Sequence, residues 1–139
     1  MRTRKSLVRA IAAVFLAMAA IPAAACGFCV EDRVAAVYDQ GAVDAARAGH
    51  RAVAFLGLDG EPAATESTRR ALVAALEASG AIRGSTRVAL ENGACAFIYD
   101  PARIELPALV AGANRRLREK HVVLNVLRWI DATGTLREP

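Results

Sequence analysis

The chain has 139 residues, 55% of them hydrophobic, and a formal net charge of +4 from 18 basic and 14 acidic residues. A positive net charge normally suggests nucleic acid or a membrane surface as a partner. Here the excess comes from Arg2, Arg4, Lys5 and Arg9, and the 114 residues from Cys26 onward hold 14 basic and 14 acidic residues. The balanced remainder argues against nucleic acid as a partner and has the length of one small domain.

Residues 1–25 have the layout of a secretory signal peptide. A basic segment is followed by an apolar run at 10–21, by Pro22, and by three alanines at 23–25 that form a small-residue cleavage site. The apolar run is shorter than the roughly 20 residues of a membrane span. We therefore predict an exported protein, periplasmic or secreted. A membrane location is expected only if Cys26 is lipidated or the signal stays uncleaved.

Residues 26–49 are predicted to form a helical lead segment that begins with a Cys-x-x-Cys motif, Cys26 and Cys29. Valines recur at helical spacing after this motif, and Gly41 and Gly49 interrupt the pattern. The third cysteine of the chain lies far away in the sequence. Three cysteines are too few for a disulfide scaffold, so we expect the fold to depend on packing.

Residues 50–131 are predicted to form one domain with the element order β-α-β-β-α-β. Strands are expected at 50–58, 86–90, 94–99 and 121–131, and helices at 65–79 and 107–120. The boundaries follow from local signals, namely Thr65 as a helix cap, Gly80 as a helix end, Asn92-Gly93 as a hairpin turn and Pro107 in a first helical turn. The polar residues 132–139 are predicted to be a frayed tail.

This element order is the split βαβ, or ferredoxin-like, arrangement. The predicted class is α+β, a sandwich in which a four-stranded antiparallel sheet carries two helices on one face, preceded by the short helical segment.

Residues 88–117 resemble the second half of a heavy-metal-associated domain. A hairpin, a strand that ends in Tyr99-Asp100-Pro101 and a helix a few residues later are typical of that family, and the helix that ends at Gly80 resembles the family's first helix. The resemblance implies a ferredoxin-like fold and the handling of soft metals. However, the loop at 57–65, where the family carries Met-x-Cys-x-x-Cys, contains no Cys, Met or His. The family's metal site therefore does not carry over to this loop.

Cys26 and Cys29 are the candidate metal ligands. Together with the helical pattern after them they resemble the family's motif, which suggests a relocated metal-binding element. Thiolates select Cu(I) or Zn over hard cations, and two protein ligands complete a linear Cu(I) site more easily than a tetrahedral Zn site. This interpretation predicts a non-catalytic metal-binding protein whose partner is a metal-transport or metal-delivery protein.

Other interpretations of the motif stay open. Cys-Gly-Phe-Cys also resembles the thioredoxin-like Cys-Gly-x-Cys, although Glu31 and Asp32 would oppose a thiolate there. A structural disulfide between the two cysteines, an acylated Cys26, and an interaction domain that has lost the family's metal site are the remaining alternatives.

Three further residues are expected to have structural rather than ligand roles. Cys95 is predicted to be a buried, inert thiol on the same strand face as Phe97 and Tyr99. His50 and His121 are each predicted to lie exposed at the start of a strand. The sequence contains no recognisable catalytic set, so we predict that the protein is not an enzyme.

Overall fold

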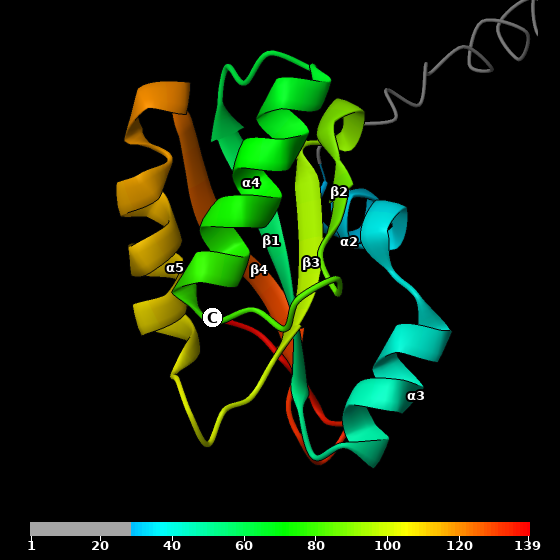
Figure 1. Ribbon diagram of the computed structural model, residues 1–139. Coiled ribbons are helices and arrows are strands. Elements are labelled where there is room, and N and C mark those ends of the chain that lie inside the picture. The colour runs from blue at the N-terminus through cyan, green and yellow to red at the C-terminus, as the bar shows by residue number, and fades with distance from the viewer. Residues whose placement is uncertain (1–28) are drawn as a thin grey trace, which may run out of the picture.

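The structure is a computed structural model that describes residues 29–139 (Figure 1). The predicted signal peptide and Cys26 therefore lie outside the described residues. The α-helices are α2 (Val30–Val37), α3 (Gln40–Ala48), α4 (Glu66–Ser79) and α5 (Leu106–Arg116), and the 3₁₀ helices are η1 (Leu90–Asn92) and η2 (Arg118–Lys120). The strands are β1 (Ala52–Gly60), β2 (Arg87–Ala89), β3 (Ala94–Tyr99), β4 (Val122–Ile130) and β5 (Leu136–Arg137).

The strands form one antiparallel sheet in the order β2-β3-β1-β4-β5. The central strand β1 pairs with β3 on one side and with β4 on the other, and a bulge between Phe55 and Leu56 shifts its register against β4. The predicted combination of helices with an antiparallel sheet is confirmed. The described sheet has five strands rather than the expected four, because β5 pairs with the end of β4 at Trp129 and Ile130.

Asp131 closes the turn between β4 and β5. Its carboxylate accepts hydrogen bonds from the backbone amides of Thr133 at 2.9 Å and Thr135 at 3.0 Å, and from Nε of Arg137 at 3.0 Å. The Thr133 hydroxyl, the Thr135 amide and the Arg137 side chain hold the pKa of Asp131 well below its usual range. Residues 132–139, predicted to be a frayed tail, include this turn and the short strand β5.

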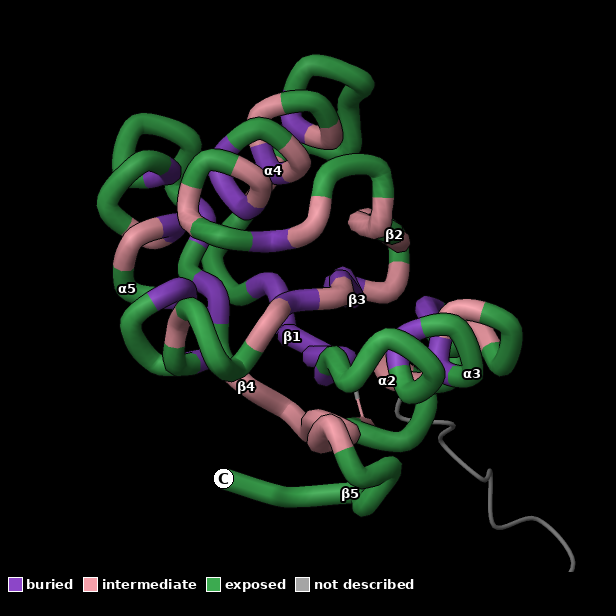
Figure 2. Tube along the Cα trace, turned by 60° about the horizontal axis from the view of Figure 1, so that its bottom comes forward, coloured by how far each residue is buried: buried purple, intermediate pink, exposed green. Residues whose placement is uncertain are grey.

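Helices cover both faces of the sheet (Figure 2). Alternate residues of β1, such as Ala54 and Leu56, pack with α4 and α5, whereas Val53 and Phe55 pack with α2 and α3. Every residue from 52 to 58 is consequently buried. The sequence predicts two helices on one face. The lead segment supplies a second layer on the other face, which explains why the β1 sequence is apolar on both sides.

The helix boundaries in the domain follow local signals. The Thr65 side chain caps α4 by accepting a hydrogen bond from the Thr68 amide at 3.2 Å, and α4 ends at Gly80, whose φ of +122° suits glycine. Pro107 lies in the first turn of α5, as predicted. However, α5 ends at Arg116 rather than at residue 120, because the chain tightens into η2 before β4 begins.

The expected hairpin between residues 86 and 99 is present with a different turn. β2 is shorter than predicted, and η1 occupies the start of the connection. Gly93 completes the turn in the left-handed region at φ +59°. The Asn92-Gly93 signal thus located the turn, whereas its preference for a two-residue loop was overridden.

Candidate functional site

Cys29 lies directly before the first residue of α2, at the N-cap position. Its side chain is half-buried, and its Sγ donates a hydrogen bond to Oδ2 of Asp32 over 2.9 Å. The Cys29 carbonyl accepts the first helical hydrogen bond, from the Arg33 amide at 3.1 Å. The second cysteine of the motif, Cys26, lies outside the described residues, so the structure describes one half of the candidate thiol pair.

The electrostatic surroundings of Cys29 are acidic. The hydrogen bond to the Asp32 side chain raises the pKa of the Cys29 thiol, and the negative charges of Asp32 and Glu31 act in the same direction. The Asp32 backbone amide lowers it and offsets only part of this effect. Cys29 therefore remains a protonated thiol near neutral pH, and its neighbours favour a positive charge at this position.

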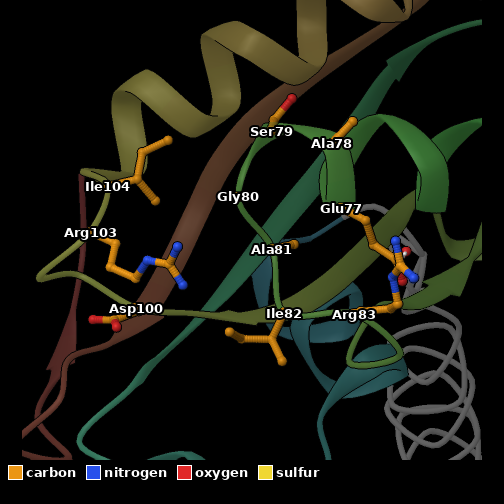
Figure 3. Close-up of a pocket in the computed structure, with 10 residues that line it drawn as sticks. All are labelled: Glu77, Ala78, Ser79, Gly80, Ala81, Ile82, Arg83, Asp100, Arg103 and Ile104. Atoms are coloured by element: carbon orange, nitrogen blue, oxygen red, sulfur yellow. Dashed lines mark ion pairs between the residues drawn. The ribbon is translucent and has the colours of Figure 1, made fainter.

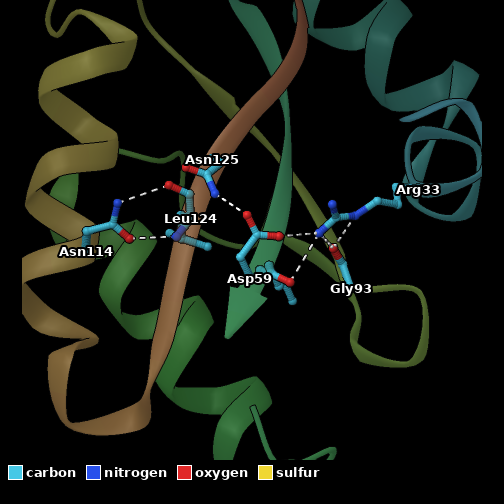
Figure 4. A network of polar contacts seen from close by, with 7 residues as sticks. Arg33, Asp59, Gly93, Asn114, Leu124 and Asn125 are labelled. Carbon is cyan, nitrogen blue, oxygen red and sulfur yellow. Dashed lines mark hydrogen bonds and ion pairs between the residues drawn. The ribbon is translucent and has the colours of Figure 1, made fainter. Parts of the chain in front are cut away.

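Arg33 fastens α2 to the sheet (Figure 4). Its guanidinium donates to the Gly93 carbonyl at 3.0 and 2.7 Å and to the Leu58 carbonyl at 3.1 Å, and it forms an ion pair with Asp59 at 3.2 Å. The Arg33 side chain is only 12% exposed. Because Arg33 lies one turn after Cys29, this clamp positions the helix that carries the thiol.

Gly57 makes room for this clamp. A Cβ atom on Gly57 would lie 2.8 to 3.0 Å from the Arg33 guanidinium, which is closer than such contacts occur. A glycine inside a strand often marks the close approach of another group. The presence of Gly57 in the otherwise apolar, buried part of β1 is thus the signal in the sequence that could have revealed the Arg33 contact.

The start of α2 borders a hollow over β4. The hollow has a volume of about 420 Å³ and is lined by Val30, Glu31, Val126, Leu127, Arg128, Glu138 and Pro139. Arg128 bridges Glu31 at 2.8 Å and Glu138 at 3.0 Å, so it ties the beginning of α2 to the end of the chain. Cys29 is therefore next to a mixed apolar and charged surface.

The remaining predicted site residues do not join Cys29. Cys95 is fully buried, as predicted, and burial raises the pKa of its thiol to about 12. His50 and His121 are exposed, as predicted, but both precede the strands in left-handed turns with φ of 53°. Between residues 29 and 139, no group of three or more His, Cys, Asp or Glu side chains is arranged to hold a metal ion.

The segment at 57–65, predicted to be a loop, begins with the last residues of β1; it contains the polar contact between Asp59 and Arg33 and no cysteine. Asp59 also accepts a hydrogen bond from the Asn125 amide of β4 (Figure 4). Asp59 thus links β1 to β4 and to α2.

A separate hollow of about 520 Å³ lies at the C-terminal end of α4 (Figure 3). Its charged lining residues are Glu77, Arg83, Asp100 and Arg103, of which Glu77 and Arg83 form an ion pair at 3.8 Å. The acids and bases balance each other, and neither cysteine nor histidine lines the hollow. Its residues do not form a nucleophile–base pair or a soft-metal site.

Comparison with models of protein families, with curated proteins and with solved structures finds no match to this chain. In the part of the chain that the structure describes, no helix has the length and apolar character needed to cross a membrane.

Two residues of this site were not singled out as contributors by sequence reasoning. Asp32 is three residues after Cys29, a spacing that brings a side chain in the first turn of a helix back to the cap residue. The partners of Arg33 are 25 and 60 residues away, so no local pattern indicates its contacts.

Proposed function

We propose that this chain is an exported, non-catalytic protein that binds a soft metal ion through Cys26 and Cys29. The observation that carries the proposal is the Cys29 thiol, which is accessible beside a carboxylate at the start of a helix that Arg33 fixes to the sheet. Cys26, three residues earlier, is close enough in sequence to bring a second thiol to the same ion.

The acidic neighbours favour a cation over a bare thiolate. Asp32 and Glu31 disfavour the extra negative charge of an isolated Cys29 thiolate. When a metal cation binds both thiolates, its positive charge offsets part of theirs, so the two carboxylates oppose the occupied site less than they oppose the bare thiolates. This difference supports metal binding over thiol–disulfide catalysis, which depends on a stabilised thiolate.

The ligand count supports Cu(I) more than Zn. Two thiolates satisfy a linear Cu(I) site, whereas Zn requires four ligands. Asp32 adds one oxygen near Cys29, and the described residues provide no further histidine or cysteine there. A tetrahedral Zn site would therefore need ligands from water or from a partner.

The fold is consistent with this proposal. We infer that β1, α4, β2, β3, α5 and β4 form a ferredoxin-like unit related to heavy-metal-associated domains, with β5 and the lead helices added to it. The support is the strand order β2-β3-β1-β4 together with α4 and α5 on one face. The metal-binding thiols would then have moved from the loop at 57–65 to the lead segment.

The proposal also includes the location of the protein and the kind of partner it has. The layout of residues 1–25 supports a periplasmic or secreted location, and a protein that binds Cu(I) without catalysis fits a metal-transport or metal-delivery protein as its partner. An acyl group on Cys26 would place the protein at a membrane and would leave a thioether in place of one thiolate ligand.

Cu(I) titration tests the metal site. The protein recovered from an exporting host is first weighed by intact mass, which gives the cleavage position and any acyl group on Cys26. Cu(I) is then titrated in competition with a chromogenic Cu(I) chelator. We expect one tightly bound Cu(I) per chain in the wild type and loss of that binding in the Cys26→Ser/Cys29→Ser variant.

Cys95→Ala is the matched control because it removes a thiol that is fully buried. It should bind Cu(I) as the wild type does. Equal Cu(I) stoichiometry in the wild type and in the Cys26→Ser/Cys29→Ser variant would overturn the proposal, and so would an acyl mass on Cys26. A disulfide-exchange rate well above that of a simple dithiol would favour the thiol–disulfide alternative.

A further inference from the structure

Within residues 29–139, the outer edge of β4 is largely without a strand neighbour. In the described sheet β4 pairs with β1 along its length, but on its other side β5 pairs only with Trp129 and Ile130. Residues 122–128 therefore present an edge on which another strand can align. Such edges pair with other chains unless the protein blocks them.

The side chain of Asn114 occupies the middle of this edge (Figure 4). Asn114 lies in the last turns of α5, and its Nδ2 donates to the Leu124 carbonyl at 3.0 Å while its Oδ1 accepts from the Leu124 amide at 2.8 Å. A carboxamide has the same donor and acceptor as a peptide group. Asn114 thus bonds to Leu124 as a residue of a neighbouring strand would.

The contact also defines which backbone groups face outward. Because the Leu124 amide and carbonyl bond to Asn114, they point away from β1, and the alternation of an antiparallel ladder gives Val122 and Val126 the same orientation. These three residues are symmetric about Leu124. A second copy of β4, related by a twofold axis at Leu124, would pair Val122 with Val126 of the partner and Leu124 with itself.

We propose that Asn114 is a plug that prevents the chain from pairing with a second copy of itself through β4. The edge is self-complementary in its hydrogen-bonding pattern, which is the requirement for a twofold interface. The side chain of Val123 is 51% exposed on the face of β4 opposite the buried Val122 and Leu124, and the partner strand of such a dimer would cover part of it. While the Asn114 amide holds both polar groups of Leu124, the central pair of that interface cannot form.

Asn114→Ala tests the plug, with Asn125→Ala as the matched control. The control removes an amide from β4 that bonds to Asp59 rather than to the edge. Sedimentation equilibrium over a range of concentrations should show the wild type and Asn125→Ala as monomers. Asn114→Ala should form dimers with an association constant at least about tenfold above that of the wild type, which is a change of about 1.4 kcal/mol.

A second substitution locates the interface. Val123→Lys and Asn125→Lys would face each other across the proposed twofold axis, and like charges opposite one another oppose strand pairing. The triple variant Asn114→Ala/Val123→Lys/Asn125→Lys should therefore be a monomer. Dimers that persist would show that association uses another surface and would overturn the proposal.

Asn114→Asp guards against a variant that fails to fold. Aspartate keeps the size of the side chain and the acceptor for the Leu124 amide, and it replaces the donor to the Leu124 carbonyl with a negatively charged oxygen. We expect its self-association to lie between that of the wild type and that of Asn114→Ala. Either of two results would overturn the proposal: a wild type that dimerises with its Leu124 amide in the interface, or Asn114→Ala and Asn114→Asp chains that fold and stay as monomeric as the wild type.

Discussion

The two faces of the sheet are built in different ways. The face under α4 and α5 is an aliphatic core, in which large side chains such as Leu72, Leu76 and Leu109 are fully buried. The face under α2 and α3 has fewer large buried residues, and it combines Val37 and Phe55 with polar ties made by side chains at its margin.

This difference indicates that one face mainly stabilises the fold, whereas the other mainly positions the candidate site. The α4–α5 face contributes most of the hydrophobic stabilisation, since that scales with buried apolar area. The α2–α3 face contributes less, but it holds Cys29 in position through Arg33. Changes on the first face should therefore unfold the whole domain, whereas changes on the second should loosen the candidate site first.

The largest expected effect is on the α4–α5 face. Leu109→Ala should lower the free energy of unfolding by about 3 kcal/mol, because it leaves a cavity at a fully buried position. Val37→Ala, the comparison on the other face, should lower it by about 1.5 kcal/mol, because it removes fewer carbon atoms and because fewer large buried side chains surround the position. Urea unfolding measures both. Equal losses would contradict the proposed division between the two faces.

The next effect is on the Arg33 clamp. Arg33→Ala should lower the free energy of unfolding by about 2 kcal/mol, because two carbonyls lose a charged donor. Amide hydrogen exchange should increase in α2 and stay low around Cys95. Gly57→Ala should destabilise the wild type by about 1 kcal/mol by displacing the guanidinium, and should cost much less in the Arg33→Ala background. Additive losses would show that the two residues are not coupled.

A smaller, chemical effect distinguishes the two described thiols. In a Cys26→Ser background, Asp32→Asn should increase the rate at which Cys29 reacts with iodoacetamide at pH 8 several-fold. The reason is that removing the carboxylate lowers the pKa of the thiol and raises its thiolate fraction. Cys95 should remain unreactive in the native protein and react only on unfolding. An unchanged Cys29 rate would exclude Asp32 as the cause of the raised pKa.

The smallest effect is local and depends on pH. The pKa of Asp131 is lower in the folded protein than in the unfolded chain, so its contribution to the β4–β5 turn is present above pH about 4 and is lost as the pH falls further. Amide signals of residues 133–137 should shift in NMR spectra below that pH, while those of β1 stay constant. Asp131→Asn should remove this pH dependence; a transition that persists in the variant would have another origin.

The sequence alone determined features that depend on near neighbours. Thr65 caps its helix through the amide three residues later, Gly80 ends that helix, and Gly93 adopts the left-handed turn that its lack of a side chain permits. Each requires only residues within one turn of the chain. The burial of Cys95 was predictable for a similar reason, because strand alternation places it with Phe97 and Tyr99.

The tertiary structure decided what covers the second face of the sheet and what surrounds Cys29. The lead helices have amphipathic patterns that fit many surfaces, and their place on the sheet depends on contacts such as Arg33 with Gly93 and Arg128 with Glu31, which are 60 and 97 residues apart. The Asn114 contact with Leu124 forms only after α5 packs beside β4. No local pattern encodes such pairings, because they depend on the geometry of elements that are assembled from distant parts of the chain.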